Sequence, residues 1–504
     1  MGELLAGVDL GTTGTKVVLF EPGRGVVGAA SRPSSLHSGG PGFAEADVGQ
    51  WWDNVCALLV QAAAAAGVST AAISGVATSG MVPAVVVLDA EHRPLHRAIL
   101  QNDARAVREI GEIQAVLEDE SYDVLARTGS ALTQQSVAPT WRWLARHEPA
   151  VAERAGAIVG SYDWLAIRLG APVHVEANWA LESGLYEFAP DEGTLELAGH
   201  AEPVRRAAGV PNRLCPPVHQ PGSVAGEVSA EAAEATGLRA GIPIYTGGAD
   251  HVLAAYAAGL REPGDWLIKL GGAADILVVA DAPVIDRRWY LDAHPAPGLW
   301  LPNGCMATSG SLLRWFQTLV GGVALGQLDL EAENAAPASV ICLPYFLGEK
   351  SPLHDPDLRG AFIGLSLQHS RGDLFRSCME AVAYGVRHHV DVFESAGITL
   401  GAARVSNGGS GSKVWKQILA DVVGRELTSI VAQGGASLGA ALVAAVGSGA
   451  LADWRAASEY VELGKLVEPR VENAASYGEG YAMYQQLQGM LTPVSHRLAT
   501  WGRP

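Results

Sequence analysis

Residues 4–20 read LLAGVDLGTTGTKVVLF, a pattern that predicts a strand, a tight glycine turn and a second strand. Glycines in such a turn let backbone N–H groups crowd around an anion, and Thr12, Thr13 and Lys16 add further donors. Asp9 ends the first apolar run, and its carboxylate suits a phosphate site only if Mg²⁺ or a water lies between the two. An ordinary hairpin with a polar turn is the alternative. Because all these groups suit one polyphosphate, we favour a nucleotide site.

A second hairpin of the same kind begins about half a chain later, where residues 266–279 read WLIKLGGAADILVV. Two such units, one in each half, predict a duplicated architecture that clamps phosphates between the halves. No stretch fits the P-loop pattern GxxxxGK followed by Ser or Thr, and no GxGxxG turn follows a strand. The sequence therefore indicates that two hairpins, rather than a P-loop, hold the nucleotide.

The composition indicates a large, well-packed globular protein. With 504 residues the chain is too long for a single core, so two large domains are expected. The net charge of −18 opposes nucleic acid or an anionic membrane as a partner, because either would repel it. The five cysteines lack CxxC spacing, and they predict buried thiols in a reducing compartment rather than a zinc site or disulfides.

Two further patterns concern targeting. The N-terminus has no basic segment and no long apolar segment, so we expect no signal peptide. Residues 429–452 carry no charge, but they contain five glycines together with Gln433 and Ser437. This composition favours a glycine-rich turn and a buried, alanine-rich helix over a membrane span.

The first half alternates helical stretches with β-branched runs, which is typical of an α/β protein. Residues 51–66 predict a helix, and residues 73–78 and 84–89 predict strands. A glycine-containing stretch that leads into a new strand marks a boundary, and we expect the domains to be 1–246 and 247–504.

In the second half, Asp373 can cap a helix whose apolar positions follow helical spacing from Leu374 to Val390. A further strand ends at Ser406, and a glycine-rich turn at 408–412 leads into another helix. A strand, a glycine turn and a helix N-terminus make a good seat for adenosine or its α-phosphate. A plain βα turn has the same pattern and is the alternative.

Several segments together resemble the FGGY family of carbohydrate kinases, in its xylulose kinase-like form, within the actin/hexokinase-like ATPase superfamily. The likeness runs almost end to end, and the order and spacing of its motifs are specific. The motifs are GVDLGTT (7–13), WW (51–52), NDAR (102–105), TGGAD (246–250), LPYFLGEKSP (343–352), RGAFIGL (359–365) and SNGGSGS (406–412). The resemblance implies an α/β fold of two actin-like (ribonuclease H-like) domains. Each would have a mixed central sheet flanked by helices, with a cleft between the domains.

The resemblance also assigns roles to residues at matching positions. Asp250 matches the catalytic base of the family, and Asp9 matches the carboxylate associated with Mg²⁺. The matches to ATP and phosphate contacts are Gly11, Thr12, Thr13, Lys16, Gly271, Gly272, Gly310, Gly409, Ser410 and Lys413. Those at the acceptor site are Met81, Val82, Gln101, Asn102, Asp103, Gln135, Asp250 and His251. Such a set suits phosphoryl transfer, which needs positioning, charge neutralisation and an acceptor for the hydroxyl proton.

Some positions depart from the family pattern. Gly272 replaces a threonine that usually reaches the γ-phosphate, so a backbone N–H would have to make that contact. Met81-Val82 stands where xylulose kinases carry Met-His and glycerol kinases carry Arg-Glu, and Gln101 replaces a usual tryptophan. His251 is a variable position, and it can be either a ligand or a satisfied neighbour. These departures leave the identity of the acceptor open.

We therefore predict a cytoplasmic kinase that uses ATP and Mg²⁺ to phosphorylate a hydroxyl of a small sugar. The expected acceptor is a ketopentose such as xylulose, or a related sugar or polyol. Within the class, a sugar acid or another modified acceptor is the alternative; outside it, a non-kinase actin-like ATPase or a nucleotide-binding sensor. The expected partners are the sugar and ATP, with no nucleic acid and no membrane, and a homodimer is left open.

Overall fold

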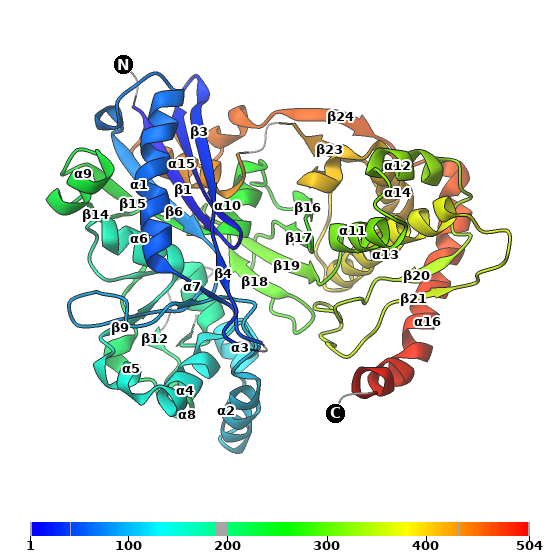
Figure 1. Cartoon of the computed structure of the whole chain (residues 1–504), viewed down its shortest axis with the longest axis horizontal. Helices are drawn as coiled ribbons and strands as arrows, with labels where there is room; N and C mark the ends of the chain where they lie inside the picture. The colour runs from blue at the N-terminus through cyan, green and yellow to red at the C-terminus, as the bar shows by residue number, and fades with distance from the viewer. Residues whose placement is uncertain (1–2, 41, 188–198, 432–433, 502–504) are drawn as a thin grey trace.

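The computed structural model describes residues 3–40, 42–187, 199–431 and 434–501, and it forms two lobes, each built on a central sheet (Figure 1). The predicted turn residue Gln433 lies outside the described residues. Helices cover both sheets, so the predicted α/β fold with mixed central sheets is confirmed.

The first sheet has six strands in the order β14-β15-β6-β1-β2-β3. β1, β2 and β3 pair antiparallel, whereas β6 runs parallel to β1 and β15 runs parallel to β6. The bounds are β1 (Leu5–Gly11), β2 (Gly14–Glu21), β3 (Gly25–Pro33), β6 (Gly75–Gly80), β14 (Val224–Glu227) and β15 (Pro243–Ala249). Only Thr12 and Thr13 separate β1 from β2, which confirms the first predicted hairpin.

The second sheet has seven strands in the order β18-β19-β17-β16-β22-β23-β24. The bounds are β16 (Trp266–Leu270), β17 (Ala274–Val278), β18 (Tyr290–Ala293), β19 (Trp300–Met306), β22 (Ala403–Ser406), β23 (Leu427–Ile430) and β24 (Leu463–Val467). β16 and β17 form the second predicted hairpin, and β22 and β23 follow it in parallel. The set β19-β17-β16-β22-β23 thus repeats β3-β2-β1-β6-β15, and the predicted duplication is confirmed.

The remaining strands are short. They are β4 (Leu36–His37), β5 (Glu45–Ala46), β7 (Val86–Leu88), β8 (Ala98–Ile99), β9 (Ala157–Val159), β10 (Val175–Glu176), β11 (Tyr186–Glu187), β12 (Gly199–His200), β13 (Val218–His219), β20 (Ile341–Leu343) and β21 (Ala361–Ile363).

The α-helices cover the sheets and fill the connections. Those of the first half are α1 (Val48–Ala65), α2 (Val107–Asp119), α3 (Val124–Thr128), α4 (Val137–His147), α5 (Pro149–Arg154), α6 (Ser161–Leu169), α7 (Ala177–Ser183), α8 (Glu202–Ala208), α9 (Ala230–Thr236) and α10 (Asp250–Ala257). Those of the second half are α11 (Gly310–Leu319), α12 (Leu325–Glu333), α13 (Arg371–Ser395), α14 (Lys413–Val423), α15 (Gly435–Gly447) and α16 (Ala474–Thr500).

Capping side chains fix where two predicted helices begin. α1 starts a turn earlier than predicted because the Asp47 side chain accepts a hydrogen bond from the Gly49 N–H. For α13 the predicted cap, Asp373, is wrong: Ser370 is the N-cap. Asp373 instead accepts hydrogen bonds from the Ser370 N–H at 2.8 Å and the Ser370 hydroxyl at 2.7 Å. The two residues form a capping box, in which each side chain satisfies the backbone of the other.

α15 belongs to the second half of the chain but packs on the first sheet. Alternate residues of β1 face opposite sides, so Leu5 joins the apolar cluster under α10 and α15, while Ala6 joins the cluster under α1. α15 lies so close to β1 that a Cβ atom on Gly7 would overlap the backbone carbonyl of Ser437. The predicted buried, alanine-rich helix is therefore part of the core of the first lobe.

The junction of the two lobes lies near the start of α10. β15 crosses the predicted boundary after residue 246 and continues in the first sheet to Ala249. Among the described residues, no helix combines the length and apolar character that a membrane span requires.

Candidate active site

Three parallel strands of the first sheet end at the same edge. Asp9 of β1 pairs with Ser79 of β6, and Ala249 at the end of β15 pairs with Gly80. Asp250 follows as the first residue of α10. In parallel sheets, ligands bind in the crevice beyond the carboxyl ends of the strands. The topology therefore brings together the two acidic residues that the sequence singled out, although they are far apart in the chain.

Asp9 is a buried carboxylate close to a second carboxylate, Asp250. Its side chain is buried, and its Oδ1 atom has no hydrogen-bond partner among the described residues. Burial, followed by the charge of Asp250, raises the pKa of Asp9 to about 7, although Lys16 and Lys269 act in the opposite direction. A carboxylate with a free oxygen beside a second carboxylate fits a divalent cation, because the cation would relieve their repulsion.

The two hairpins supply positive charge to this edge. Lys16 lies on β2, directly opposite Asp9 of the neighbouring strand β1, and it is exposed. Lys269, on β16, forms an ion pair with Asp275 on β17, at 3.1 Å between Nζ and Oδ2. Lys269 lies close enough to Asp9 and Asp250 for its charge to lower the pKa of both.

The N-terminus of α11 is tied to the turn of the second hairpin. The carbonyl of Gly271 accepts a hydrogen bond from the Gly310 N–H at 2.9 Å. The carbonyl of Gly272 accepts from the Ser309 N–H at 2.8 Å and from the Ser311 N–H at 3.1 Å. The structure thus brings together three of the predicted phosphate residues, at a helix end whose partial positive charge favours anions.

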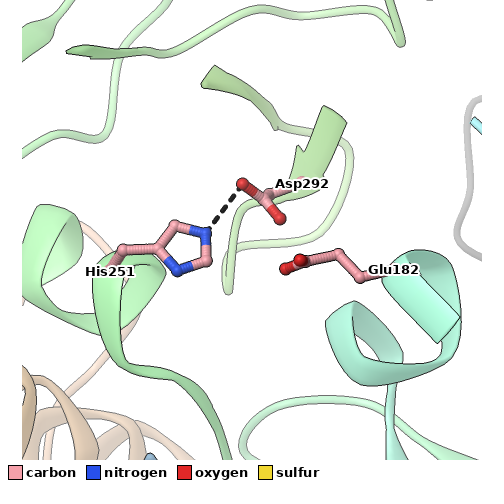
Figure 2. Close-up of side chains that lie close together, drawn as sticks. All are labelled: Glu182, His251 and Asp292. Carbon is pink, nitrogen blue, oxygen red and sulfur yellow. Dashed lines mark hydrogen bonds and ion pairs between the residues drawn. The ribbon is translucent and has the colours of Figure 1, made fainter. Parts of the chain in front are cut away.

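His251 connects Asp250 to a buried carboxylate on β18. Its Nε2 atom lies 2.8 Å from Asp292 Oδ2 (Figure 2). Its Nδ1 atom lies 3.5 Å from Asp250 Oδ1. Burial lowers the pKa of His251, but Asp292 and Asp250 outweigh it and hold that pKa well above its ordinary value. Burial raises the pKa of Asp250, but the hydrogen bond from His251 and the charge of Lys269 bring it below its ordinary value. Asp250 is therefore ionised at neutral pH, as a general base requires.

Glu182 of α7 completes this polar group. Figure 2 shows its carboxylate turned toward Asp292 and His251. Burial, followed by the charge of Asp292, raises the pKa of Glu182 well above its ordinary value. Glu182 Oε1, Asp292 Oδ1 and Asn303 Oδ1 are buried and have no hydrogen-bond partner among the described residues while Glu182 is ionised, whereas a protonated Glu182 can donate to Asp292. Since unpaired buried polar atoms are costly, these three oxygens favour a ligand that can donate hydrogen bonds.

Sequence reasoning missed these three residues as candidates. Glu182 lies near the end of a helix, Asp292 lies on a four-residue strand, and Asn303 lies on the neighbouring strand β19. None of them belongs to a motif with characteristic spacing. The only available signal was that Asp292 and Asn303 are polar residues within otherwise apolar strands.

The residues predicted to bind the acceptor differ from one another in burial and in hydrogen bonding. Met81 and Val82 are buried directly after β6, and the Met81 N–H donates to the carbonyl of Leu10. Gln101 has a buried, unpartnered Oε1, whereas Asn102 is exposed. In the described part of the chain, no hydrogen bond or ion pair joins Gln101, Asn102, Asp103 or Gln135 to Asp250 or His251.

Asp103 is occupied by neighbouring residues. Its Oδ2 atom accepts a hydrogen bond from the Ala44 N–H at 2.6 Å and pairs with Arg105 NH2 at 2.8 Å. Arg105 also pairs with Glu45 at 2.6 Å and lies over the Phe43 ring at 4.0 Å. These contacts fix the position of Asp103 and help to hold the loop between β8 and α2.

The predicted adenosine turn lies directly after β22. It forms a short 3₁₀ helix, η4 (Gly408–Gly411), and Ser412 then caps α14 by accepting from the Trp415 N–H. A Cβ atom on Gly409 would lie 2.6 Å from atoms of Leu270 and Trp415, so only glycine fits there without rearrangement. The Ser410 hydroxyl donates to the carbonyl of Asn407 at 2.7 Å.

A cavity of about 490 Å³ joins this turn to the first hairpin. Lys16 of β2 and Asn407, just before η4, both line it, together with Ser437 of α15. A larger cavity of about 940 Å³ has walls from both halves, including Leu132 and Thr133 on one side and Tyr290 on the other. Tyr290 lies on β18, two residues before Asp292. The smaller cavity thus includes the predicted phosphate residue Lys16, whereas neither Asp250 nor His251 lines the larger one.

Comparison with known proteins identifies the family. Residues 4–257 match the N-terminal domain of the FGGY family of carbohydrate kinases, and residues 276–448 match its C-terminal domain. A solved xylulose kinase from Rhodospirillum rubrum is 42% identical, with a TM-score of 0.90, over 98% of this chain and all of the other. A xylulose kinase from Staphylococcus epidermidis is 26% identical over 99% of both chains. An autoinducer-2 kinase from Salmonella typhimurium is 27% identical over 96% of this chain and 92% of the relative.

The fold, the paired hairpins and these matches along nearly the whole chain agree with one another. The chain belongs to the FGGY family of carbohydrate kinases, whose members are ATP-dependent sugar kinases.

Proposed function

We propose that this kinase transfers the γ-phosphate of ATP to a hydroxyl of a small, uncharged, polyhydroxylated sugar, with Asp250 as the general base. The observation that carries the proposal is the setting of Asp250. His251 and Lys269 hold its pKa below the ordinary value, and it lies beyond the end of β15, between the two hairpins.

In the proposed reaction, the acceptor hydroxyl attacks the γ-phosphorus of ATP. A new oxygen–phosphorus bond forms, the bond from the γ-phosphorus to the β,γ-bridging oxygen breaks, and ADP leaves with that electron pair. Asp250 accepts the hydroxyl proton. Because the transition state carries charge on the phosphoryl oxygens, positioning and charge neutralisation supply most of the catalysis.

The two hairpins would hold the phosphates of ATP. Backbone N–H groups near Gly11 and Gly272 and the ammonium groups of Lys16 and Lys269 are the donors available at this edge. Mg²⁺, held by Asp9, would neutralise the phosphate charge as the transition state forms. Gly409, Ser410 and Lys413 would contact the adenosine.

The polar side chains next to Asp250 favour a ketopentose such as xylulose, or a related sugar or polyol, as the acceptor. The unpartnered oxygens of Glu182, Asp292 and Asn303 lie beside the base and can accept hydrogen bonds from several hydroxyls. An acceptor with few hydroxyls would leave them unpaired, at a cost in transition-state binding. Asp250 itself is ionised, and its negative charge opposes a sugar acid because like charges repel.

We expect that a panel of pentoses, hexoses, polyols and sugar acids, tested for ADP release with Mg-ATP, will show a ketopentose well ahead of glycerol. Glycerol kinases carry an Arg-Glu pair where this chain has the buried apolar residues Met81 and Val82. The expected preference in kcat/KM is on the order of 10²-fold or more, since two or more buried oxygens are left unpaired. If glycerol proved the best acceptor of the panel, this assignment would be wrong.

A modified acceptor is the second candidate function. It is favoured by the similarity over almost the whole length to a protein named autoinducer-2 kinase. Phosphorylation of a sugar acid or of another modified acceptor added to the panel, with all pentoses, hexoses and polyols inactive, would select it over the first candidate.

The Gly272→Thr variant is expected to increase kcat/KM for ATP. A Cβ atom on Gly272 would meet nothing within 4 Å, so the side chain has room at the phosphate turn. A threonine hydroxyl that donates to a phosphate oxygen is worth up to roughly tenfold in rate. Steady-state kinetics at varied ATP concentration measures the gain. Gly272→Val is the matched control, because it has the same shape without the hydroxyl. An equal gain in both variants would exclude the proposed contact.

The His251→Asn variant is expected to move the acidic limb of the pH profile of kcat/KM to higher pH. Loss of the imidazolium charge raises the pKa of Asp250, so the base becomes protonated at a pH where the wild-type base is still ionised. The expected displacement is roughly one pH unit or more. His219→Asn is the control, since His219 has no contact with Asp250 among the described residues. Superimposable profiles for wild type and His251→Asn would contradict this role of His251.

A further inference from the structure

The distribution of lysine along the chain is uneven. Only six of the 35 basic residues are lysines, and the other 29 are arginines. Three of the six lie at or near the two hairpins: Lys16 and Lys269 act on Asp9, and Lys350 lies close enough to Cys305 and Asp275 for their charges to raise its pKa. The other three, which are Lys413, Lys416 and Lys465, line a single cavity of about 690 Å³.

This cavity lies along α14, next to the edge strand β24 of the second sheet. Its polar side carries the three lysines and Arg470. Its apolar side includes Val414, Ile418, Val431, Leu466 and Val467. The cavity is separate from the hairpins, but Lys413 and α14 lie directly after the predicted adenosine turn η4.

The positive charges of the cavity are not neutralised by the protein. In the described ranges, Lys269 is the only lysine within ion-pair distance of a carboxylate, and Arg470 has no ion pair there. Lys416 reaches only the Ser429 hydroxyl, at 3.4 Å, and burial together with the charge of Lys413 lowers its pKa. Lys413 therefore repels Lys416, and neither has an ion pair among the described residues.

The other charged groups of the cavity offset only part of this positive charge. Asp421 already accepts hydrogen bonds from the Arg470 N–H and from the Gln417 and Asn473 side chains. Arg376 pairs with Glu380 outside the cavity, at 2.7 Å. Glu333 is the remaining carboxylate of the lining. The result is a locally positive cavity in a chain whose net charge is −18.

We propose that this cavity is a second binding site, for a small phosphorylated molecule that carries at least two negative charges. Lysine and arginine side chains are the usual ligands of phosphate, and a bound anion would relieve their mutual repulsion. The volume and the mixed apolar and cationic lining are typical of a site for a small metabolite. Nucleic acid is opposed by the net charge of −18, because long-range repulsion would oppose its approach.

The test is a calorimetric titration of inorganic pyrophosphate into the full-length protein at low ionic strength. Wild type is expected to bind pyrophosphate at two sites, the hairpins and the cavity. Lys465→Ala/Arg470→Ala should weaken binding at the cavity roughly tenfold or more and leave the hairpin site and kinase activity intact. Lys16→Met should weaken the hairpin site and leave the cavity site intact. Arg24→Ala/Arg108→Ala, which removes two exposed positive charges elsewhere, is the matched control.

Two results would overturn the proposal. One is a Lys465→Ala/Arg470→Ala protein, folded by its melting curve, that binds pyrophosphate as the control does. The other is loss of all pyrophosphate binding in Lys16→Met. In a second arm, ADP and ribose 5-phosphate are titrated into Lys16→Met. The tighter ligand shows whether the cavity prefers a nucleotide or a sugar phosphate, and failure of both to bind would exclude a phosphorylated metabolite.

Discussion

The Asp250→Asn variant is expected to bind ATP as wild type does and to lose acceptor phosphorylation by roughly 10²–10⁴-fold in kcat, the usual contribution of a general base. Asparagine keeps the size of the side chain and its hydrogen bonding to His251, but it cannot accept the proton of the acceptor hydroxyl. Asp250 is also the carboxylate whose charge raises the pKa of Asp9. The variant should therefore retain or slightly strengthen its affinity for free nucleotide, because one negative charge leaves the phosphate site.

The measurement is kcat for the best acceptor of the panel, together with the calorimetric Kd for ATP. Asp281→Asn is the matched control, since Asp281 is an exposed carboxylate outside the site. Near-normal turnover in Asp250→Asn would remove Asp250 as the base. Loss of ATP binding together with activity would instead assign Asp250 to the nucleotide site.

The Gly7→Ala variant is expected to lose much of its stability. A Cβ atom at this position would overlap the backbone carbonyl of Ser437, and it would lie 2.5 Å from the backbone nitrogen of Ala441. Both are backbone atoms of α15, so no rotation of a side chain relieves the clash, and α15 must move away from β1. We expect a loss of about 3 kcal/mol or more in the free energy of unfolding, at the upper end of the overpacking range.

Thermal unfolding followed by circular dichroism measures this loss. Gly111→Ala is the matched control: Gly111 lies inside α2, and a Cβ atom there meets nothing within 4 Å. Alanine should stabilise that helix by about 0.5–1 kcal/mol, because it restricts the unfolded chain and favours the helix. Equal melting temperatures for Gly7→Ala and wild type would show that α15 does not pack on β1 as described.

Much of this fold could be predicted because its signals are local. The two hairpins are continuous segments with apolar runs on both sides of a glycine turn, and both form as expected. The sequence also predicts that α15 is buried and rich in alanine, but it does not predict which sheet the helix packs on. The residues of that helix do not indicate that it packs on β1, which lies more than 400 residues earlier in the chain.

The candidate site divides in the same way. Asp9 and Asp250 could be paired only through the family resemblance, because their meeting depends on the order of strands in the sheet. The sequence does not identify Glu182 and Asp292 as site residues, because they lie on two different elements and neither belongs to a recognisable motif. Asp103 lies in a motif, but the sequence does not show that both Arg105 and the Ala44 N–H contact its carboxylate. Sequence alone does not tell which charged neighbour a carboxylate meets.

Because α15 packs on the first lobe, that lobe cannot complete its core until most of the chain has been synthesised. β1 leaves the ribosome first, yet the helix that covers one of its faces is made only near residue 440. At roughly 5–20 residues per second, the apolar side chains of that face wait for their cover for on the order of twenty seconds or more. During that interval Leu5, Val18 and Phe20 are available to other chains or to chaperones. A nascent chain halted before residue 435 should therefore aggregate or recruit chaperones, even though it contains every strand of the first sheet.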